Sequence, residues 1–143
     1  MNDITEFQGE FRWLSNFFPV QIEYEGLTYP SVENAYQAGK LINKKDREMF
    51  IDISPGKAKR LWRNYPTYNL TEEFRLNLMY HLLSIKFNQE PFKSLLIATG
   101  DCYIQEGTRW FEPFWGKQLS TGEGKNMLGH LIMNIREKIK DSN

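Results

Sequence analysis

The hydrophobic pattern is most informative from Ser31 to Lys40, where polar side chains form a narrow stripe on an otherwise apolar helix. Ser31 is a favourable N-cap, and helical spacing then places Glu33, Gln37 and Lys40 on one face. Apolar residues cover most of the remaining circumference, namely Val32, Ala35, Ala38, Leu41 and Ile42. A surface helix usually has the opposite proportions, so the pattern predicts a helix that is largely buried.

This polar stripe is a candidate for chemistry. A carboxylate and an amine are costly to bury unless they are paired or used. Glu33 and Lys40 could therefore belong to the wall of a catalytic pocket. The alternatives are a structural contact between these two side chains or a polar face that points to water.

The rest of the chain predicts a mainly helical α+β fold with a small antiparallel sheet. Alternation of apolar and polar residues over 20–29 predicts a β-hairpin with Gly26 at its turn. Further elements are helices at 55–62, after the N-cap Thr71, at 91–98 and from Lys125 onward, and a short strand at 103–106. The charged cluster 44–48 is expected to be a solvated face.

Two helices supply most of the predicted core. Apolar side chains at helical spacing form the buried face of each: Phe74, Leu78, Met79, Leu82, Leu83 and Ile85 in one, and Met127, Leu128, Leu131, Ile132, Ile135 and Ile139 in the other. The chain has 143 residues and no repeat, low-complexity segment or linker. It is therefore predicted to be a single domain over residues 1–143.

Composition and charge limit the partners. The 18 basic and 18 acidic residues give a formal net charge of zero, which argues against broad electrostatic binding to nucleic acid but not against a small anion held by a local basic cluster. No apolar run approaches the ~20 residues of a membrane span, and the first residues lack the features of a signal peptide. We therefore expect a soluble, cytoplasmic protein with no membrane partner, and the sequence does not indicate its oligomeric state.

Metal and disulfide chemistry have little support. Cys102 is the only cysteine, so an intramolecular disulfide and a multi-cysteine zinc site are excluded. With His81 and His130 as the only histidines, we predict neither a metal site nor a cofactor. Cys102 precedes an apolar-alternating run and is interpreted as a half-buried, inert thiol.

Two aromatic-rich segments fall outside ordinary core patterns. In 11–19, aromatic residues surround Arg12, Ser15 and Asn16, so this segment is either a hydrophobic plug or a ligand-binding loop. In 110–116, four aromatic residues surround Glu112. A carboxyl group in an apolar box has a raised pKa and suits a general acid, and a tryptophan there could stack on a nucleobase. The alternative is a loop that covers the core while its carboxylate points to water.

One further segment could hold a phosphate. A glycine-rich turn at 120–126 precedes the last helix, where free backbone N–H groups and Lys125 would favour an anion. The turn lacks the Gly-Lys-Ser/Thr pattern of a P-loop, and many helices begin in this way. Separately, a short basic groove that would suit nucleic acid could be formed by Lys57, Lys59, Arg60 and Arg63, or these residues could simply solvate a helix.

Taken together, these segments resemble the YbiA/NADAR family. The resemblance is carried by an ordered set of motifs: Leu14-Ser15-Asn16-Phe17, Ser31-x-Glu33-x-x-Tyr36-Gln37-Ala38-x-Lys40, Lys86-Phe87-x-Gln89, Leu95-Leu96-x-Ala98-Thr99-Gly100, Phe114-Trp115-Gly116 and Gly124-Lys125-Asn126-x-Leu128-Gly129-x-Leu131-Ile132-Met133-x-Ile135-Arg136. The chain differs from the YbiA type at two places. It has Glu112 where that type has an aspartate, and Leu70 or Thr71 where that type has a tryptophan.

The resemblance implies a YbiA-like fold and an N-glycosidase that cleaves the ribose–base bond. One branch of the family acts on phosphoribosyl intermediates of riboflavin biosynthesis, and another removes ADP-ribose from guanine bases in nucleic acid. The implied substrate is a small nucleotide or an ADP-ribosylated nucleobase, with modified nucleic acid as a further candidate partner. A non-catalytic module that binds nucleotides derived from NAD or ADP-ribose, and a protein-interaction domain, are the alternatives.

Cleavage of a ribose–nitrogen bond develops positive charge on the sugar and negative charge on the leaving base, so the site needs an acid near the base and a group that manages the cation. The candidate catalytic residues are Glu33, Lys40 and Glu112, of which Glu33 and Lys40 match the family's glutamate and lysine. Lys40 would form a Schiff base with a ring-opened ribose or act electrostatically on a phosphate. The candidate substrate-binding residues are Arg12, Ser15, Asn16, Phe17, Tyr36, Gln37, Trp110, Trp115, Gly116, Lys125 and Asn126.

Overall fold

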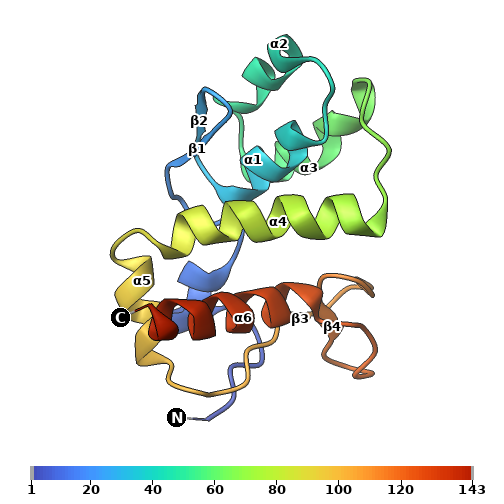
Figure 1. The fold of residues 1–143 in the computed structure, drawn as a ribbon. Helices are drawn as coiled ribbons and strands as arrows, with labels where there is room; N and C mark the ends of the chain where they lie inside the picture. The colour runs from blue at the N-terminus through green and yellow to red at the C-terminus, as the bar shows by residue number, and fades with distance from the viewer. Residues whose placement is uncertain (1, 143) are drawn as a thin grey trace. The chain divides into compact units, whose positions relative to one another are not determined.

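The chain is mainly helical, with two sheets of two short strands each (Figure 1). The computed structural model describes residues 2–142. It contains two compact units: unit 1 is formed by Met1–Ser15 with Phe87–Asn143, and unit 2 by Asn16–Lys86. The predicted α+β class with a small antiparallel sheet is confirmed, whereas the single domain over 1–143 stays a prediction.

Unit 2 begins with the predicted hairpin and continues through short helices to a long one. Its elements are β1 (Ile22–Tyr24), β2 (Leu27–Tyr29), α1 (Val32–Gly39), α2 (Lys44–Arg47), the 3₁₀ helix η2 (Glu48–Phe50), α3 (Pro55–Leu61), the 3₁₀ helix η3 (Trp62–Asn64) and α4 (Glu72–Phe87). β1 and β2 pair antiparallel, with Tyr24 opposite Leu27. Glu25 and Gly26 at the turn both have positive φ, as a two-residue hairpin turn of type I′ requires.

Helix α1 forms as predicted because its first turn is capped. The Ser31 hydroxyl accepts a hydrogen bond from the Asn34 backbone N–H at 3.1 Å, and every residue of α1 is buried. The Asn34 amide donates to the carbonyl oxygens of Phe50 and Ile53, each at 2.9 Å, which ties α1 to the following segment. At the other end, a Cβ at Gly39 would lie 2.9 Å from a methyl group of Leu78. A larger residue at this position would require the Leu78 side chain of α4 to move.

The charged cluster 44–48 is only partly the solvated face that was predicted. Arg47 is buried, and its guanidinium donates to the Leu41 carbonyl oxygen and to the Glu25 carboxylate. The hydrogen bond from Arg47 lowers the pKa of Glu25. The prediction fails at Arg47 because this side chain holds the segment after α1 in place. The spacing of charges in the sequence does not indicate such a role.

Helix α4 begins as predicted, because the Thr71 hydroxyl accepts a hydrogen bond from the Phe74 N–H at 3.1 Å. Its buried face is displaced from the predicted one. Leu78, Met79, Leu82 and Leu83 are buried, whereas Phe74 and Ile85 are only half-buried. The completely buried Lys86 was not anticipated from the sequence.

Unit 1 consists of the two ends of the chain. Its elements are the 3₁₀ helix η1 (Gly9–Leu14), α5 (Phe92–Ala98), β3 (Gly107–Thr108), β4 (Lys117–Gln118) and α6 (Met127–Asp141). Trp13 and Leu14 of η1 are buried, which favours the plug interpretation for this part of the aromatic segment. α5 is followed by Gly100 at a φ of +65°, as predicted for its C-terminus.

The strand predicted at 103–106 is wrong. Only Ile104 pairs, in an isolated parallel bridge with Ile4, where the Ile4 N–H donates to the Tyr103 oxygen and the Gln105 N–H to the Ile4 oxygen. The strands present instead, β3 and β4, are parallel and two residues long each. Such short pairings have no sequence period to reveal them.

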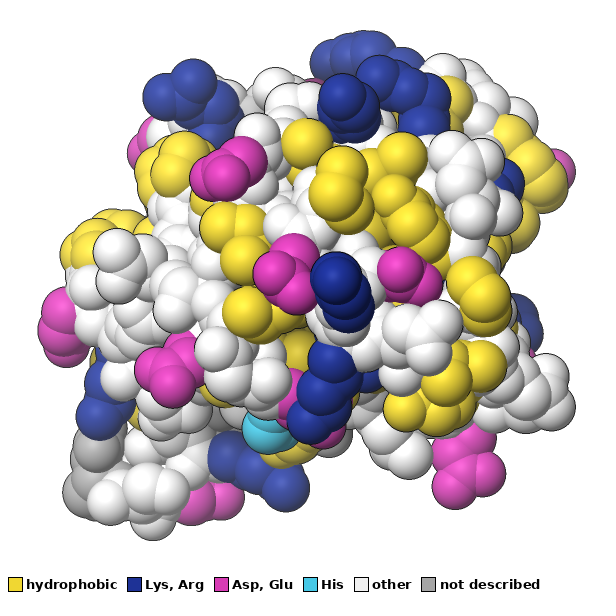
Figure 2. All heavy atoms as spheres, turned by 90° about the horizontal axis from the view of Figure 1, so that it is seen from above, with side chains coloured by type: hydrophobic (Ala, Val, Ile, Leu, Met, Phe, Trp, Pro, Cys, Tyr) yellow, Lys and Arg dark blue, Asp and Glu magenta, His cyan; other side chains and the backbone are white. Residues whose placement is uncertain are grey.

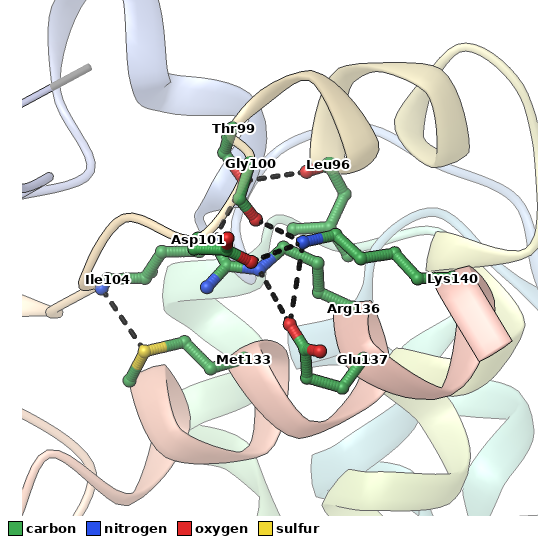
Figure 3. A network of polar contacts seen from close by, with 9 residues as sticks. All are labelled: Leu96, Thr99, Gly100, Asp101, Ile104, Met133, Arg136, Glu137 and Lys140. Carbon is green, nitrogen blue, oxygen red and sulfur yellow. Dashed lines mark hydrogen bonds and ion pairs between the residues drawn. The ribbon is translucent and has the colours of Figure 1, made fainter.

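Buried and half-buried cations fasten α6 to the end of α5 (Figure 3). Arg136 donates to the Thr99 hydroxyl at 2.9 Å, and Lys140 donates to the Gly100 carbonyl oxygen at 2.6 Å and the Asp101 carboxylate at 2.7 Å. Basic groups at a helix C-terminus satisfy its last carbonyl groups and complement its dipole. These cations therefore have a structural explanation.

Within residues 2–142, no helix is both long and apolar enough to cross a membrane, and no group of three or more histidine, cysteine or acidic side chains is arranged to hold a metal ion. Cys102 is half-buried, as predicted.

Candidate active site

The polar stripe of α1 is buried within unit 2. Glu33 and Lys40 expose only 8% and 7% of their surface, and Gln37 exposes 4%. The Gln37 side-chain amide donates to the Glu33 carboxylate at 2.5 Å. The alternative of a stripe pointing to water is therefore wrong. A carboxylate, an amide and an amine are all buried along this face of α1.

The Lys40 amine lies over two aromatic rings. Its Nζ is 3.9 Å from the ring centroid of Trp62 and 4.9 Å from that of Tyr36. Cation–π contacts of this kind hold an ammonium group at a desolvated position. The two rings therefore fix where the amine lies after the helix ends.

Burial lowers the pKa of Lys40 from 10.5 to about 8. The charge of Glu33 acts in the opposite direction, while the nearby cations Arg63 and Arg75, followed by Lys59, lower the pKa further. A lysine with a pKa near 8 has a substantial neutral fraction at physiological pH, which an ordinary lysine lacks. The neutral amine is the form that attacks a carbonyl or iminium carbon.

Two buried acceptors beside this stripe have no hydrogen-bond partner among residues 2–142. They are the side-chain oxygens of Asn16 and Gln37. The Asn16 backbone oxygen accepts from the Glu33 N–H at 3.0 Å, so Asn16 belongs to the same cluster. Unpaired buried acceptors are rare and costly.

Trp62 is a member of the cluster that sequence reasoning missed. It was assigned only to the end of a basic helix, yet its indole ring receives the Lys40 amine. The available signal was a large aromatic residue among Lys57, Lys59, Arg60 and Arg63, outside any apolar seam. Hydrophobic periodicity does not identify such a residue, because the pattern does not show which side chain a single aromatic ring will contact.

Glu112 does not lie in a closed apolar box within unit 1. Trp110 and Phe111 expose 56% and 67% of their surface, and the Glu112 carboxylate accepts hydrogen bonds from the N–H groups of Phe114 and Trp115 at 2.9 and 3.0 Å. The carboxylate therefore shapes its own loop. The expected enclosure fails because two of the four aromatic side chains are exposed.

The amides at the start of α6 are not free, contrary to the phosphate hypothesis. The N–H groups of residues 125–128 donate to the carbonyl oxygens of Pro113, Gly116, Phe114 and Trp115. The Asn126 side chain is also occupied, because it bonds the Glu106 N–H, the Ile104 oxygen and the Tyr103 hydroxyl at 2.9, 3.0 and 3.1 Å. The N–H groups that were expected to bind an anion are therefore bonded to carbonyl oxygens of the preceding loop.

The predicted site residues thus divide between the two units. Unit 2 holds Asn16, Phe17, Glu33, Tyr36, Gln37 and Lys40, of which Phe17 is 43% exposed and the others are buried. Unit 1 holds Arg12, Ser15, Trp110, Glu112, Trp115, Gly116, Lys125 and Asn126. The last five of these meet at the start of α6, and the Arg12 side chain is exposed on η1. Their catalytic and binding roles stay predictions.

Comparison with known proteins identifies the family. The model of the NADAR domain matches residues 5–140. The protein named N-glycosidase YbiA from Shigella boydii is 35% identical over 129 residues, which cover 87% of this chain and 79% of that protein. A riboflavin biosynthesis protein of Vibrio vulnificus is 32% identical over 133 residues, covering 90% of this chain but only 36% of that longer protein.

The fold supports the same assignment. The NMR structure of Escherichia coli YbiA matches 99% of this chain and 88% of its own with a TM-score of 0.84 and 31% sequence identity. The predicted YbiA-like fold is therefore confirmed. The chain belongs to the NADAR family, a family of N-glycosidase enzymes, as its motifs predicted.

Proposed function

We propose that this chain hydrolyses the N-glycosidic bond between ribose and a nucleobase, with Glu33 and Lys40 as the catalytic pair. The substrate is ADP-ribosylated guanine or a phosphoribosyl metabolite such as an intermediate of riboflavin biosynthesis. The observation that carries the proposal is the buried Lys40 amine, held against Trp62 and Tyr36 with its pKa lowered to about 8. Structural lysines normally keep their charge at the surface or in an ion pair.

The lowered pKa of Lys40 supports a covalent route. After the ribose ring opens, C1′ is bound to the base nitrogen as an iminium, and the neutral Lys40 amine adds to C1′. The base then leaves with the electron pair of the C1′–N bond and a proton. Water hydrolyses the resulting lysine imine, which returns the amine and the free sugar. The electrostatic alternative keeps Lys40 charged beside a substrate phosphate.

Glu33 is proposed to transfer the proton that the leaving base requires. Its carboxylate accepts a hydrogen bond from the Gln37 amide and lies on the same helical face as Lys40. General acid–base catalysis by a positioned carboxyl group contributes ~10²–10⁴ in rate. Gln37 then acts as a positioning residue, because its amide orients the carboxylate while its own oxygen remains available to a ligand.

A mass-spectrometric product assay tests the proposal. Wild type and Lys40→Ala are incubated with an ADP-ribosylated guanine oligonucleotide, the riboflavin-pathway pyrimidine ribosyl phosphates, ADP-ribose and NAD. We expect release of a base or of ADP-ribose from one substrate by wild type, and its loss in the variant. Binding without turnover by folded wild type would instead assign a nucleotide-binding module, and full activity of Lys40→Ala would overturn the site.

Sodium borohydride separates the two roles of Lys40. A lysine imine is reduced to a stable secondary amine, so the covalent route predicts a sugar adduct on the peptide that contains Lys40. An active enzyme that gives no adduct under turnover would support the electrostatic role.

A further inference from the structure

The Lys40 amine is held by aromatic rings and not by a polar partner. Within residues 2–142, its Nζ makes no hydrogen bond and no ion pair, and its side-chain contacts are those with the rings of Trp62 and Tyr36. Glu33 acts on the amine through its charge, while its carboxylate accepts a hydrogen bond from Gln37. The position of the amine therefore depends on the two rings.

The backbone of Lys40 is fixed, but this does not fix the end of its side chain. The Lys40 N–H donates to the Gln37 carbonyl oxygen at 3.3 Å, and the Lys40 carbonyl oxygen accepts from the Tyr68 N–H at 2.9 Å. A lysine side chain has four flexible carbons and one of the largest rotamer entropies of any residue. A contact close to Nζ is therefore needed to keep the amine in one direction.

Trp62 is brought to this amine by α3. The helix is capped by Ser54, whose hydroxyl accepts from the Lys57 N–H at 3.1 Å, and α3 packs against α1. Trp62 comes directly after α3 as the first residue of η3. Its ring centroid is 3.9 Å from the Lys40 Nζ, which makes it the nearer of the two rings. At this distance no water molecule fits between the ring and the amine.

Partial exposure of Trp62 would not by itself indicate a role. Hydrophobic side chains lie at the surface among acidic and basic ones on the face shown in Figure 2, and scattered apolar surface of this kind is normal. Trp62 differs because its ring contacts a buried amine. The Arg63 guanidinium also lies against this ring, 5.0 Å from the centroid, but Arg63 is exposed.

We propose that Trp62 is a positioning residue for the reaction, because its ring excludes water from the Lys40 amine and keeps that amine in one direction. This inference rests on the proposed function, in which the neutral amine attacks C1′. Exclusion of water favours the neutral amine, whereas the face of the ring attracts the ammonium form. Burial is the largest cause of the lowered pKa of Lys40, so exclusion of water is the stronger of the two effects.

NMR titration of lysine amines tests the proposal in the free protein, without substrate or turnover. The protein is labelled with ¹³C at lysine Cε, and the Lys40 signal is the one that Lys40→Met lacks. We expect Trp62→Ala to raise the pKa of Lys40 from about 8 toward 10.5, by about one pH unit or more, because water reaches the amine. Trp62→Phe keeps an aromatic ring and should stay closer to wild type than Trp62→Ala does.

Other charges do not confound this titration. The charged groups that act on Lys40 are Glu33 on α1, Lys59 on α3, Arg63 on η3 and Arg75 on α4. All four remain in every Trp62 variant, so a change in the titration reports the ring.

Two further variants separate the ring from general loosening of α3. Leu61→Ala is the matched control, because Leu61 precedes Trp62 and is also half-buried; it should leave the Lys40 titration unchanged. Trp62→Gln keeps more of the side-chain volume but lacks the ring. It should raise the pKa of Lys40 as Trp62→Ala does, and it replaces that variant if alanine prevents folding.

Activity gives a second readout that a structural role would not move. If the chain turns over a substrate, kcat/KM of Trp62→Ala should fall by about tenfold at pH 7. Its pH profile should move to higher pH, so that part of the activity returns in alkaline solution, and Trp62→Phe should restore most of the activity at pH 7.

Three results would overturn the proposal. They are an unchanged Lys40 titration in both Trp62→Ala and Trp62→Gln, a lowered pKa in these variants, and an equal shift in Leu61→Ala. Failure of the proposed function is a different outcome, because it is decided by the product assay with Lys40→Ala. A chain that cleaves its substrate while Trp62→Ala titrates like wild type would retain the function, and Trp62 would have no positioning role.

Discussion

The α1 cluster of unit 2 and the loop–helix junction of unit 1 are built from similar residues but are used differently. Both hold a carboxylate, a buried amide side chain and aromatic residues from the family motifs. In the junction, the side chains of Asn126 and Glu112 are bonded to backbone groups of the chain and, for Asn126, to the Tyr103 hydroxyl as well. In the α1 cluster, Asn16 and Gln37 each keep a buried oxygen without a partner among the described residues.

This difference distinguishes polar residues that stabilise the fold from polar residues proposed to act on a substrate. A buried polar side chain whose bonds are internal stabilises the fold, whereas one with open acceptors reduces stability until a ligand arrives. Lys40 follows the same logic, because its lowered pKa shows that the folded chain disfavours the charged amine. The cluster that reduces the stability of the folded chain is therefore the one proposed to catalyse the reaction.

The largest expected effect is on catalysis by Glu33→Gln. We expect turnover of the substrate found in the product assay to fall by ~10²–10⁴, because the glutamine cannot transfer a proton. The fold should persist, since an amide at position 33 can still accept from Gln37. Glu23→Gln, at an exposed position of β1, is the matched control. Turnover of Glu33→Gln equal to that of the control would remove the carboxylate from the mechanism.

At the loop–helix junction of unit 1, we expect a substitution to reduce stability. Asn126→Ala removes three side-chain hydrogen bonds and places alanine at a φ of +50°, so we expect the free energy of unfolding to fall by about 2–4 kcal/mol. Urea denaturation measures this loss. Asn134→Ala, at an exposed position of α6, should change it by less than about 0.5 kcal/mol. An equally stable Asn126→Ala would contradict the structural role.

A smaller effect is expected from Glu112→Ala. Loss of its two backbone hydrogen bonds should lower the free energy of unfolding by about 1 kcal/mol, and turnover by less than about tenfold. The exposed Glu123→Ala serves as the control. If Glu112 were instead the general acid of the sequence-based hypothesis, turnover would fall by ~10² or more with stability almost unchanged.

A separate effect is the pH dependence of stability that arises from Lys40. Between pH 8 and 10.5 the folded chain has lost the Lys40 proton while the unfolded chain keeps it, so the unfolded state binds more protons. The free energy of unfolding should therefore rise with pH in this window relative to that of Lys40→Met. The difference is measured by urea denaturation of both proteins at several pH values. A flat or falling difference would show that the amine is not destabilised by folding.

The sequence predicted much of the fold where the signal was local. The hairpin turn at Gly26, the caps at Ser31 and Thr71 and the buried stripe of α1 follow from short-range rules. The sequence did not reveal the isolated bridge of Ile104 or the parallel strands β3 and β4, because each depends on a segment distant in the chain.

The site was predicted to a similar extent. Glu33, Gln37 and Lys40 share a face because of helical spacing alone. Trp62 could not be found in this way, because it reaches Lys40 through the packing of α1 against α3. The amides of residues 125–128 looked available in the sequence and are occupied in the structure, since their carbonyl partners come from the preceding loop.

The central claim is that Lys40 is buried for chemistry and not for stability. The most direct test is the free energy of unfolding of Lys40→Met at pH 7, measured on preparations whose turnover is also known. Methionine fills a similar volume without a charge, so we predict a stability equal to or above that of wild type, together with loss of turnover. A clear loss of stability with turnover retained would contradict the account and make Lys40 a structural residue.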